Sequence, residues 1–242
     1  MVYTEIKYKI PKIVHYTFKT NYLPKNIVDV INHNKEMCKD FEFKFYDDND
    51  IDNFINENFN PNIYNAFKSI NDNLGAMKAD FFRYCVLYIR GGVYIDIKSK
   101  IMHPLGKIIH PNDICILDIP RNNLERWRRY SPTHEQWVLM FAPKHPYLLS
   151  VINLIVNYIN NRHNPSIQGI RMLNTKEKIL NITGPDAFSR AINLYLFLNK
   201  IKLHRCVDYF KYFQLNGANN YKNMYTLNGI NHYSEVNEPL YK

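Results

Sequence analysis

The sequence predicts an α/β fold, a Rossmann-like, mostly parallel sheet flanked by helices. Two observations lead to this prediction. Short apolar segments rich in β-branched residues indicate buried strands, and between them lie longer segments whose apolar residues recur at helical spacing. Strands that alternate with helices are typical of parallel sheets, whose ligands bind beyond the carboxyl ends of the strands. With 242 residues, 46% of them hydrophobic, the chain is long enough to bury one sizeable core.

The first third of the chain is expected to form two strands, each followed by helices. The run Ile10–Phe18 is short and apolar, as a buried strand would be, and Pro24 opens the helix that follows. A second apolar run ends in the polar residues Asp47–Asp50, which can cap the next helix. Strands are therefore expected at 10–18 and 41–46, and helices at 24–34, 50–59, 61–70 and 75–89.

A glycine pair is expected to end the last of these helices. Gly91 and Gly92 allow the chain to turn into the next strand, VYIDIK at 93–98. Because side chains alternate along a strand, its three apolar residues share one face, and Tyr94, Asp96 and Lys98 share the other. One face of this strand therefore belongs to the core, and the other carries groups that can do chemistry.

The rest of the chain continues the alternation. A strand is expected at 113–119 and helices at 135–141, 146–160 and 185–198. The end of the chain, 209–242, is aromatic and rich in Asn, with strand-like fragments. Since no repeat and no linker interrupts the sequence, we expect a single domain over 1–242, with 209–242 as a C-terminal extension.

The charge of the chain suits an anionic partner but does not indicate nucleic acid. There are 31 Lys and Arg against 22 Asp and Glu, a net charge of +9. The basic residues are scattered, and the local cluster at Arg121–Arg129 is interrupted by Asn122 and Glu125. No nucleic-acid-binding module is recognisable, so no nucleic-acid partner is expected and a lysine-rich surface explains the charge.

Cysteine spacing and hydropathy indicate the cellular compartment. The four cysteines are far apart and form no CxxC pair, which argues against a zinc site or a disulfide framework and favours a reducing compartment. The first residues are charged where a signal peptide needs an apolar run, and no apolar stretch approaches the ~20 residues that span a bilayer. A cytoplasmic protein without a transmembrane segment is expected.

Three charged residues form the candidate site. Asp80 and Arg83 are three residues apart on an expected helix, so their side chains share a face. Alone, such a pair is equally typical of an ordinary surface salt bridge. This helix, however, leads through the glycine turn to a strand that brings Asp96 to the same sheet edge. Arginine and aspartate placed there can bind sugar hydroxyls, and the guanidinium also favours a phosphate.

Four motifs, in order, carry a resemblance to a known family. They are IPKIVHYTF at the start, FYDD, KADFFRYCVLYIRGGVYIDIK at 78–98 and TGPDAF at 183–188. Together they resemble glycosyltransferase family 32, which holds capsular polysaccharide transferases and Golgi mannosyltransferases. The resemblance implies a GT-A fold and a nucleotide-sugar donor linked to UDP or GDP. It also implies transfer to the hydroxyl of a glycan or other acceptor with retention of anomeric configuration.

The resemblance assigns the main roles at the site. Asp80 and Arg83 would hold the donor sugar, and Asp96, the first acid of a DxD motif, would contact the donor and organise a metal site. Gln136 would support the developing charge at the anomeric centre, although its segment also suits a helix cap. His232 would bind the metal, typically Mn²⁺, or the diphosphate, and the extension 209–242 would close the donor site.

The remaining donor-binding residues have alternative roles. Phe18 stands where the family commonly has Trp, so it either stacks on the base or belongs to the core. Asp47 and Asp48 either meet the nucleoside or only cap the following helix. The predicted donor-binding set is His15, Tyr16, Phe18, Asp47, Asp80, Arg83, Tyr94, Asp96 and Lys98.

Lys98 departs from the family pattern, because it stands where the second acid of the DxD motif would bind the metal. An ammonium repels a divalent ion, so three alternatives stay open. Asp96 and His232 hold the metal, or Lys98 or Lys100 replaces it as a fixed cation on the leaving phosphate, or catalysis is lost and sugar binding remains. The last alternative describes a non-catalytic carbohydrate-binding protein. In the enzyme, the basic segment 121–129 would form a loop near the acceptor, for a phosphorylated or acidic glycan.

Overall fold

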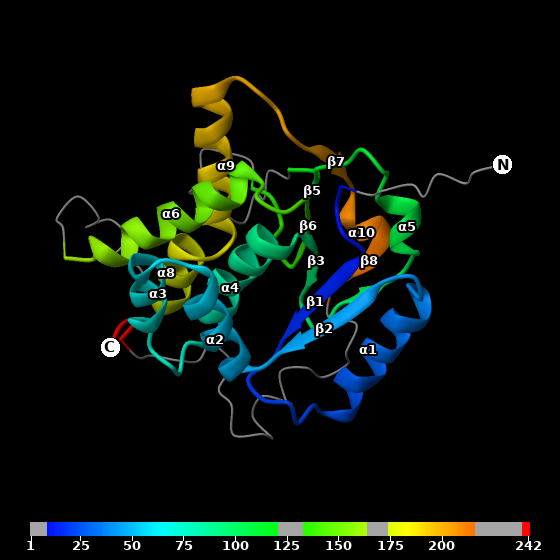
Figure 1. The fold of residues 1–242 in the computed structure, drawn as a ribbon, viewed down its shortest axis with the longest axis horizontal. Coiled ribbons are helices and arrows are strands. Elements are labelled where there is room, and N and C mark those ends of the chain that lie inside the picture. Colours follow the sequence, from blue (N-terminus) through cyan, green and yellow to red (C-terminus); the bar gives the residue numbers. More distant parts are fainter. Residues whose placement is uncertain (1–8, 121–132, 164–173, 216–238) are drawn as a thin grey trace.

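A six-stranded sheet forms the centre of the molecule (Figure 1). The computed structural model describes residues 9–120, 133–163, 174–215 and 239–242. The strand order is β2-β1-β3-β6-β5-β7, and β6 alone runs against its neighbours β3 and β5. The predicted α/β fold with a mostly parallel sheet is therefore confirmed. The strands are β1 (Ile13–Thr17), β2 (Glu42–Tyr46), β3 (Gly92–Ile95), β5 (Cys115–Asp118), β6 (Val138–Phe141) and β7 (Arg205–Val207).

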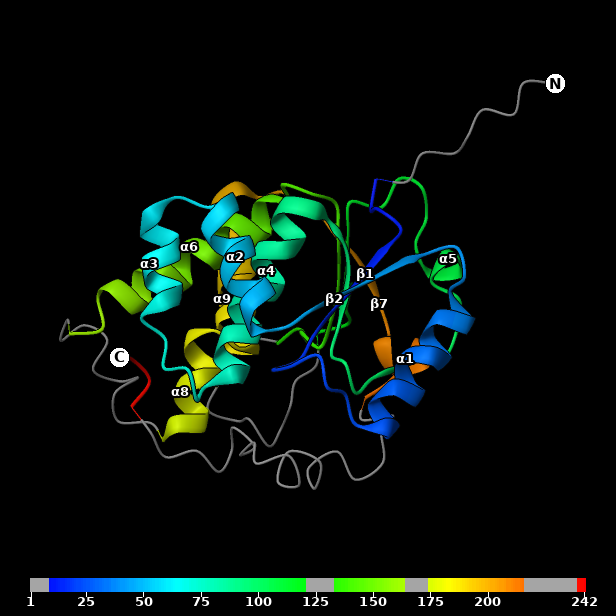
Figure 2. The ribbon, with the colours of Figure 1, turned by 60° about the horizontal axis from the view of Figure 1, so that its bottom comes forward.

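Helices cover both faces of this sheet (Figure 2). The larger layer packs on one face and comprises α2 (Asp48–Asn58), α3 (Pro61–Lys68), α4 (Gly75–Arg90), α6 (Pro146–Asn160), α8 (Thr175–Ile182) and α9 (Pro185–Asn199). The other face carries α1 (Lys25–Met37), α5 (Leu105–Ile108) and α10 (Tyr209–Tyr212), together with a small two-stranded sheet of β4 (Lys100–Ile101) and β8 (Phe213–Gln214). None of the helices in the described part of the chain is long and apolar enough to cross a bilayer.

Alternation along the strands divides the interior into two cores. Val93 and Ile95 of β3 point into the core beneath α1, whereas Tyr94 points into the core beneath the large helical layer. The alternation predicted for this strand is thus confirmed. Each face of the sheet buries its own apolar set, which is what holds both helical layers in place.

Polar caps set where the helices of the large layer begin. The Asp47 carboxylate accepts hydrogen bonds from the backbone N–H groups of Asn49 and Asp50, and the Asp47 backbone N–H donates to the Asp50 carboxylate. This capping box starts α2 at Asp48, two residues before the predicted start. Asn174 caps α8 in the same way through Glu177.

The glycine pair forms the predicted turn between α4 and β3. Gly91 and Gly92 have φ angles of 65° and 96°, which L side chains rarely adopt. A Cβ atom on Gly92 would lie 2.5 Å from the carbonyl oxygen of Ile13 on β1. Glycine therefore allows β3 to pair with β1 directly after the helix.

The helix predicted at 135–141 is wrong, because this segment leads into strand β6. All four residues of β6 are buried, so the strand shows no alternation of apolar and polar residues. Periodicity cannot separate such a short, fully buried strand from a helical turn. Two further differences concern boundaries and short elements: β3 ends at Ile95 instead of 98, and α5, α8, β4 and β7 are additional to the predicted set.

Candidate active site

A cavity of about 320 Å³ opens at the edge of the sheet where β1 and β3 end and β6 begins. The reversed direction of β6 brings its start to this edge. Ile95, the last residue of β3, pairs with Val138, and the Asp96 N–H donates to the Trp137 carbonyl at 2.8 Å. The edge follows the rule that α/β folds bind ligands beyond the carboxyl ends of their strands. Of the predicted site residues, those lining the cavity are Phe18, Asp80, Arg83, Tyr94, Asp96, Lys98 and Gln136.

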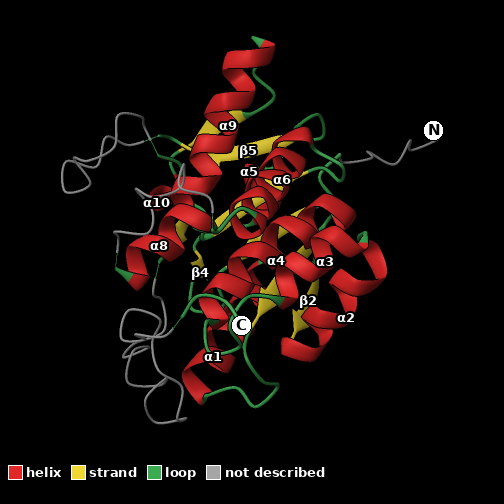
Figure 3. Cartoon of the chain, turned by 90° about the vertical axis from the view of Figure 1, so that its left-hand side faces the viewer, coloured by secondary structure: helices red, strands yellow, loops and turns green. Residues whose placement is uncertain are grey.

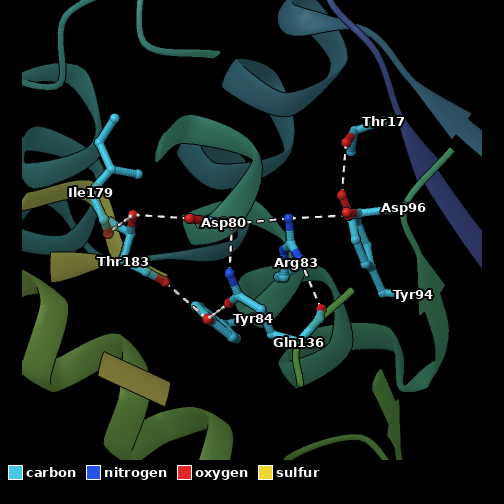
Figure 4. Close-up of polar contacts among 9 residues, drawn as sticks. All are labelled: Thr17, Asp80, Arg83, Tyr84, Tyr94, Asp96, Gln136, Ile179 and Thr183. Atoms are coloured by element: carbon cyan, nitrogen blue, oxygen red, sulfur yellow. Dashed lines mark hydrogen bonds and ion pairs between the residues drawn. The ribbon is translucent and has the colours of Figure 1, made fainter. Parts of the chain in front are cut away.

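Arg83 lies at the centre of the polar contacts in this cavity (Figure 4). Its Nη2 atom is 2.9 Å from Asp80 Oδ1 and 3.3 Å from Asp96 Oδ1, and its Nη1 donates to the Gln136 carbonyl at 2.7 Å. Arg83 is only 5% exposed and Asp80 only 6%. Because the pair is buried and bridges to a third segment, it differs from an ordinary surface salt bridge.

Asp80 is held by partners from three parts of the chain. Beside Arg83, it accepts hydrogen bonds from Gln136 Nε2 at 3.1 Å and from the Thr183 hydroxyl at 3.2 Å. Burial raises the pKa of the Asp80 carboxyl to about 6, although the Arg83 guanidinium acts in the opposite direction. The carboxylate is therefore ionised at neutral pH but titrates in the weakly acidic range.

Gln136 and Thr183 are linked behind Asp80 by Tyr84. The Tyr84 hydroxyl contacts the Gln136 side-chain oxygen and lies 2.9 Å from the Thr183 carbonyl. Both ends of the Gln136 amide therefore contact protein groups. Thr183 belongs to the TGP motif, in which Gly184 packs so closely that a Cβ atom would lie 2.7 Å from Leu180 Cα. This close packing brings α8 and α9 together at the floor of the site.

Aromatic and hydroxyl groups form the wall toward β1. The Tyr94 ring lies 4.6 Å from the Arg83 guanidinium, and its hydroxyl is 2.9 Å from the Thr17 hydroxyl. Burial raises the pKa of Tyr94 to about 12, so the phenol stays protonated at neutral pH. Phe18 follows on the same wall, half-buried, and also packs against the core beneath α1. Both roles considered for Phe18 are compatible with this position.

Further charged residues line the outer part of the cavity. Lys19 follows β1, Asp48 starts α2, and Asp72 lies in the loop before α4. Hydrogen bonds from Lys242 and Lys78 lower the pKa of Asp72 to about 2. Because Lys242 Nζ is 2.6 Å from Asp72, the last residues of the chain reach the rim of the cavity.

The described residues do not form a complete site for a divalent metal. Asp96 offers a carboxylate at the cavity, but Arg83 is 3.3 Å from one of its oxygens and Lys98 lines the same space. Within residues 9–120, 133–163, 174–215 and 239–242, no three His, Cys, Asp or Glu side chains are grouped to hold a metal ion. His232, the second predicted ligand, lies outside the described residues, as does the basic segment 121–129. The Mn²⁺ site stays a prediction.

Three residues of the predicted donor set lie away from the cavity. His15 is buried, and its ring lies 2.9 Å from the Gly91 carbonyl and 3.2 Å from the Tyr46 hydroxyl. Tyr16 points into the core beneath α1 and accepts a hydrogen bond from Asn34 at 2.7 Å. Asp47 caps α2, which was the alternative considered for it. The geometry gives all three residues structural contacts and does not bring them to the cavity.

The structure adds residues that the sequence analysis did not assign to the site. Thr183 and Tyr84 complete the support of Asp80, while Thr17 and Lys19 flank Phe18. Thr183 could have been assigned, since it opens the TGP motif. Tyr84 lies in the motif at 78–98, but spacing does not indicate its role, because its partners lie 52 and 99 residues away.

Comparisons with known proteins agree with this geometry. Residues 21–115 match the sequence model of the glycosyltransferase sugar-binding region containing a DXD motif. The inositol phosphoceramide mannosyltransferase 3 of Schizosaccharomyces pombe is 29% identical over 166 residues, which are 68% of this chain and 42% of the relative. The initiation-specific alpha-1,6-mannosyltransferase of Candida albicans is 26% identical over 172 residues, covering 62% of this chain and 44% of the relative. The chain thus spans less than half the length of these curated relatives.

Two solved structures share the fold. The PaToxG glycosyltransferase superposes with a TM-score of 0.58 at 14% identity, covering 77% of this chain and 70% of that one. The UDP-bound glycosyltransferase domain of the YGT toxin superposes with a TM-score of 0.57 at 8% identity, covering 82% and 79% of the two chains. The chain therefore has the GT-A fold, and its resemblance to glycosyltransferase family 32 is confirmed, with the family's sugar-binding region at residues 21–115.

Proposed function

We propose that this protein is a glycosyltransferase that moves a sugar from a nucleotide-sugar donor to an acceptor hydroxyl with retention of configuration. The observation that carries the proposal is the cluster of buried Asp80 and Arg83 with the partly exposed Asp96 at the cavity. Carboxylates accept hydrogen bonds from sugar hydroxyls, and the guanidinium favours the charge of a phosphate. The printed names of the relatives favour mannose as the sugar to test first.

The supporting contacts fix the donor-binding groups before any sugar arrives. Asp80 is oriented by Gln136 and Thr183, and Arg83 is oriented by the Gln136 carbonyl. Groups that need no rearrangement on binding stabilise a transition state more effectively than mobile ones. Gln136 acts here as a positioning residue, since both ends of its amide contact protein groups. Its predicted direct role at the anomeric centre would need one of these contacts to open.

The experiment is a hydrolysis screen with GDP- and UDP-linked sugars, since retaining transferases often hydrolyse their donors without acceptor. Donor turnover should occur with at least one sugar and should fall by about 100-fold or more in Asp80→Asn and Arg83→Lys. The first change removes a buried charge, and the second replaces the guanidinium with an ammonium that cannot reproduce its contacts to Asp80, Asp96 and the Gln136 carbonyl. Asp40→Asn is the matched control, since Asp40 pairs with Lys12 on the surface. Turnover in the two site variants equal to that of the control would contradict the proposal.

We also propose that the Lys98 ammonium stabilises the negative charge of the donor diphosphate. Support comes from its place in the cavity, which Asp96 also lines. A fixed cation near a leaving phosphate stabilises the charge that develops as the bond breaks. In a DxD motif this charge is met by the metal.

A substitution of Lys98 distinguishes stabilisation of the diphosphate by the lysine from stabilisation by a metal ion. Wild-type turnover should be unaffected by EDTA, whereas Lys98→Asp, which restores DxD, should lose activity in EDTA and recover with added Mn²⁺. Lys98→Met tests the lysine charge alone and should lower turnover by about tenfold or more. Wild-type activity that EDTA abolishes and Mn²⁺ restores would instead favour the metal site of Asp96 and His232.

A second candidate is a non-catalytic carbohydrate-binding protein on the same fold, and Lys98 in place of the second acid favours it. The same donor panel distinguishes the two functions. Sugar binding measured by calorimetry, without hydrolysis or transfer of any donor, would support the second candidate.

A further inference from the structure

The C-terminal half of α9 exposes an apolar surface. Leu194, Phe197, Leu198 and Ile201 are 51%, 68%, 66% and 55% exposed. Leu194, Phe197 and Leu198 are spaced by three and four residues along one side of the helix, and Ile201 follows just beyond its end at Asn199. Figures 1 and 3 show this end of α9 standing out from the rest of the described chain. We call these four residues the α9 tip.

The α9 tip is distinct from the face by which α9 joins the core. Phe188, Ala191 and Ile192 are buried in the core shared with α4 and α6. The fold therefore does not need the tip for packing. Large apolar side chains gathered on one exposed surface are typical of interaction sites.

Charge around the α9 tip indicates an anionic partner. Residues 187–207 include no Asp or Glu, but they do include Arg190, Lys200, Lys202 and Arg205. Arg205 is neutralised by Asp113 at 2.7 Å, whereas Lys200 and Lys202 are exposed beside the tip. Lys200 Nζ lies 4.3 Å from the Phe197 ring centroid, so positive charge and apolar surface are in contact.

We propose that the α9 tip docks on the surface of a bilayer that contains anionic lipids. Leucine and phenylalanine side chains would enter the boundary between headgroups and acyl chains, and the two lysines would meet lipid phosphates. A second copy of the chain fits less well. A symmetric contact through this short tip would bring the lysines of both copies together without an acidic residue from the segment to pair them.

The proposed docking surface leaves the cavity open. Pro185, at the start of α9, lines the cavity, and the 15-residue helix places the tip on the order of 20 Å away. Docking would hold the active-site edge near the membrane without blocking it. The inference rests on the surface of α9 and not on the proposed glycosyl transfer.

Vesicle flotation tests the proposal with phosphatidylcholine alone and with about one third phosphatidylserine. The protein should bind the anionic vesicles more tightly than the neutral ones, and less tightly at high salt. Binding should fall by about tenfold or more in Phe197→Ser/Leu198→Ser and in Lys200→Glu/Lys202→Glu. The matched controls, which should bind as wild type, are Tyr22→Ser, at an 87% exposed aromatic residue, and Lys35→Glu/Lys39→Glu at and just after the end of α1.

Three other outcomes would overturn the proposal of membrane docking. Wild-type protein that does not bind anionic vesicles overturns it, as does equal binding by the tip variants and the controls. If the wild-type protein does not bind vesicles but forms a dimer, and Phe197→Ser/Leu198→Ser dissociates this dimer, the α9 tip is instead the contact with a second copy. Thermal unfolding of every variant confirms that the compared proteins are folded.

Discussion

Arg83 contacts the carboxylates of Asp80 and Asp96, which lie near it in the sequence, and the backbone carbonyl of Gln136, which lies 53 residues away. The three side chains Asp80, Arg83 and Asp96 carry a net charge of −1 when both acids are ionised, while Lys98 and Lys19 add positive charge at the cavity. Asp48, Asp72 and Glu135 line the same cavity and add negative charge. In the proposed function, the Asp80 and Asp96 carboxylates bind sugar hydroxyls, and Arg83, Lys19 and Lys98 bind the phosphate charge.

The raised pKa of Asp80 predicts how activity depends on pH. Its carboxyl has a pKa of about 6, above the ordinary value, because burial disfavours the charged form. Below pH 6 the protonated acid loses its charge pairing with Arg83. We therefore expect kcat/KM for donor hydrolysis to fall about tenfold for each pH unit below 6, measured from pH 8 to pH 5.

Donor binding measured across the same range supplies the control. If Asp80 holds the sugar, the donor Kd should rise as activity falls, and circular dichroism should show that the protein is still folded. A profile that is flat from pH 7.5 to pH 5 would contradict the assigned role of Asp80.

At this scale the sequence predicts residues that are close along the chain. Asp80, Arg83 and Asp96 share a short segment with clear helical and strand spacing, and the cavity contains all three. Thr183 contacts Asp80 across 103 residues, and the Gln136 carbonyl contacts Arg83 across 53. Such contacts depend on how helices pack, which spacing alone does not determine. Tyr16 points to the opposite face of the sheet from Thr17, which lines the cavity, and His15 lies farther from the carboxyl end of β1.

Strand β6 has the largest effect on the site among the elements. It enters the sheet against the direction of β3 and β5, and its start therefore lies beside the ends of β1 and β3. A helix at 135–141 would have left Gln136 without this position. The sequence correctly predicted the long helices, because their periodicity extends over several turns. It missed β6, α5, β4 and β7, which are too short to show a period, and also the eight-residue helix α8.

The turn from α4 to β3 gives a prediction for a single element. Gly92→Ala should destabilise the fold by at least about 2 kcal/mol, because a φ of 96° is strained for alanine and its Cβ would meet the Ile13 carbonyl at 2.5 Å. Urea unfolding followed by circular dichroism measures this change. Gly106→Ala is the control, since its nearest new contact is 3.8 Å away. Equal midpoints for the two variants would show that β1 and β3 can separate at little cost.

Across the whole molecule, buried histidines predict loss of stability in weak acid. Burial lowers the pKa of both His15 and His145 to about 4. Their stabilising contribution is present above the unfolded-state pKa of about 6.5 and is lost as pH falls toward 4. At pH 5, protonation of each histidine in the unfolded chain lowers the free energy of unfolding by on the order of 2 kcal/mol. Asp80, whose pKa is raised, changes it in the opposite direction by about 1 kcal/mol.

The free energy of unfolding should therefore be about 2 to 3 kcal/mol lower at pH 5 than at pH 7.5, measured by urea titration. In His145→Gln the difference between the two pH values should shrink by about 2 kcal/mol, whatever the variant's stability at pH 7.5. The same difference in wild type and variant would exclude His145 as a source of the acid sensitivity.

The cavity is built from residues that span most of the chain, from Thr17 on β1 to Leu215 after β8. No partly folded form that lacks β1 or α9 would possess it. A ligand that fills the cavity therefore binds the native state and not the unfolded chain. By mass action, a donor at one hundred times its Kd would raise the free energy of unfolding by about 2.7 kcal/mol. The concentration of the proposed donor would thus affect the resistance of the protein to thermal unfolding and proteolysis, even when no acceptor is present.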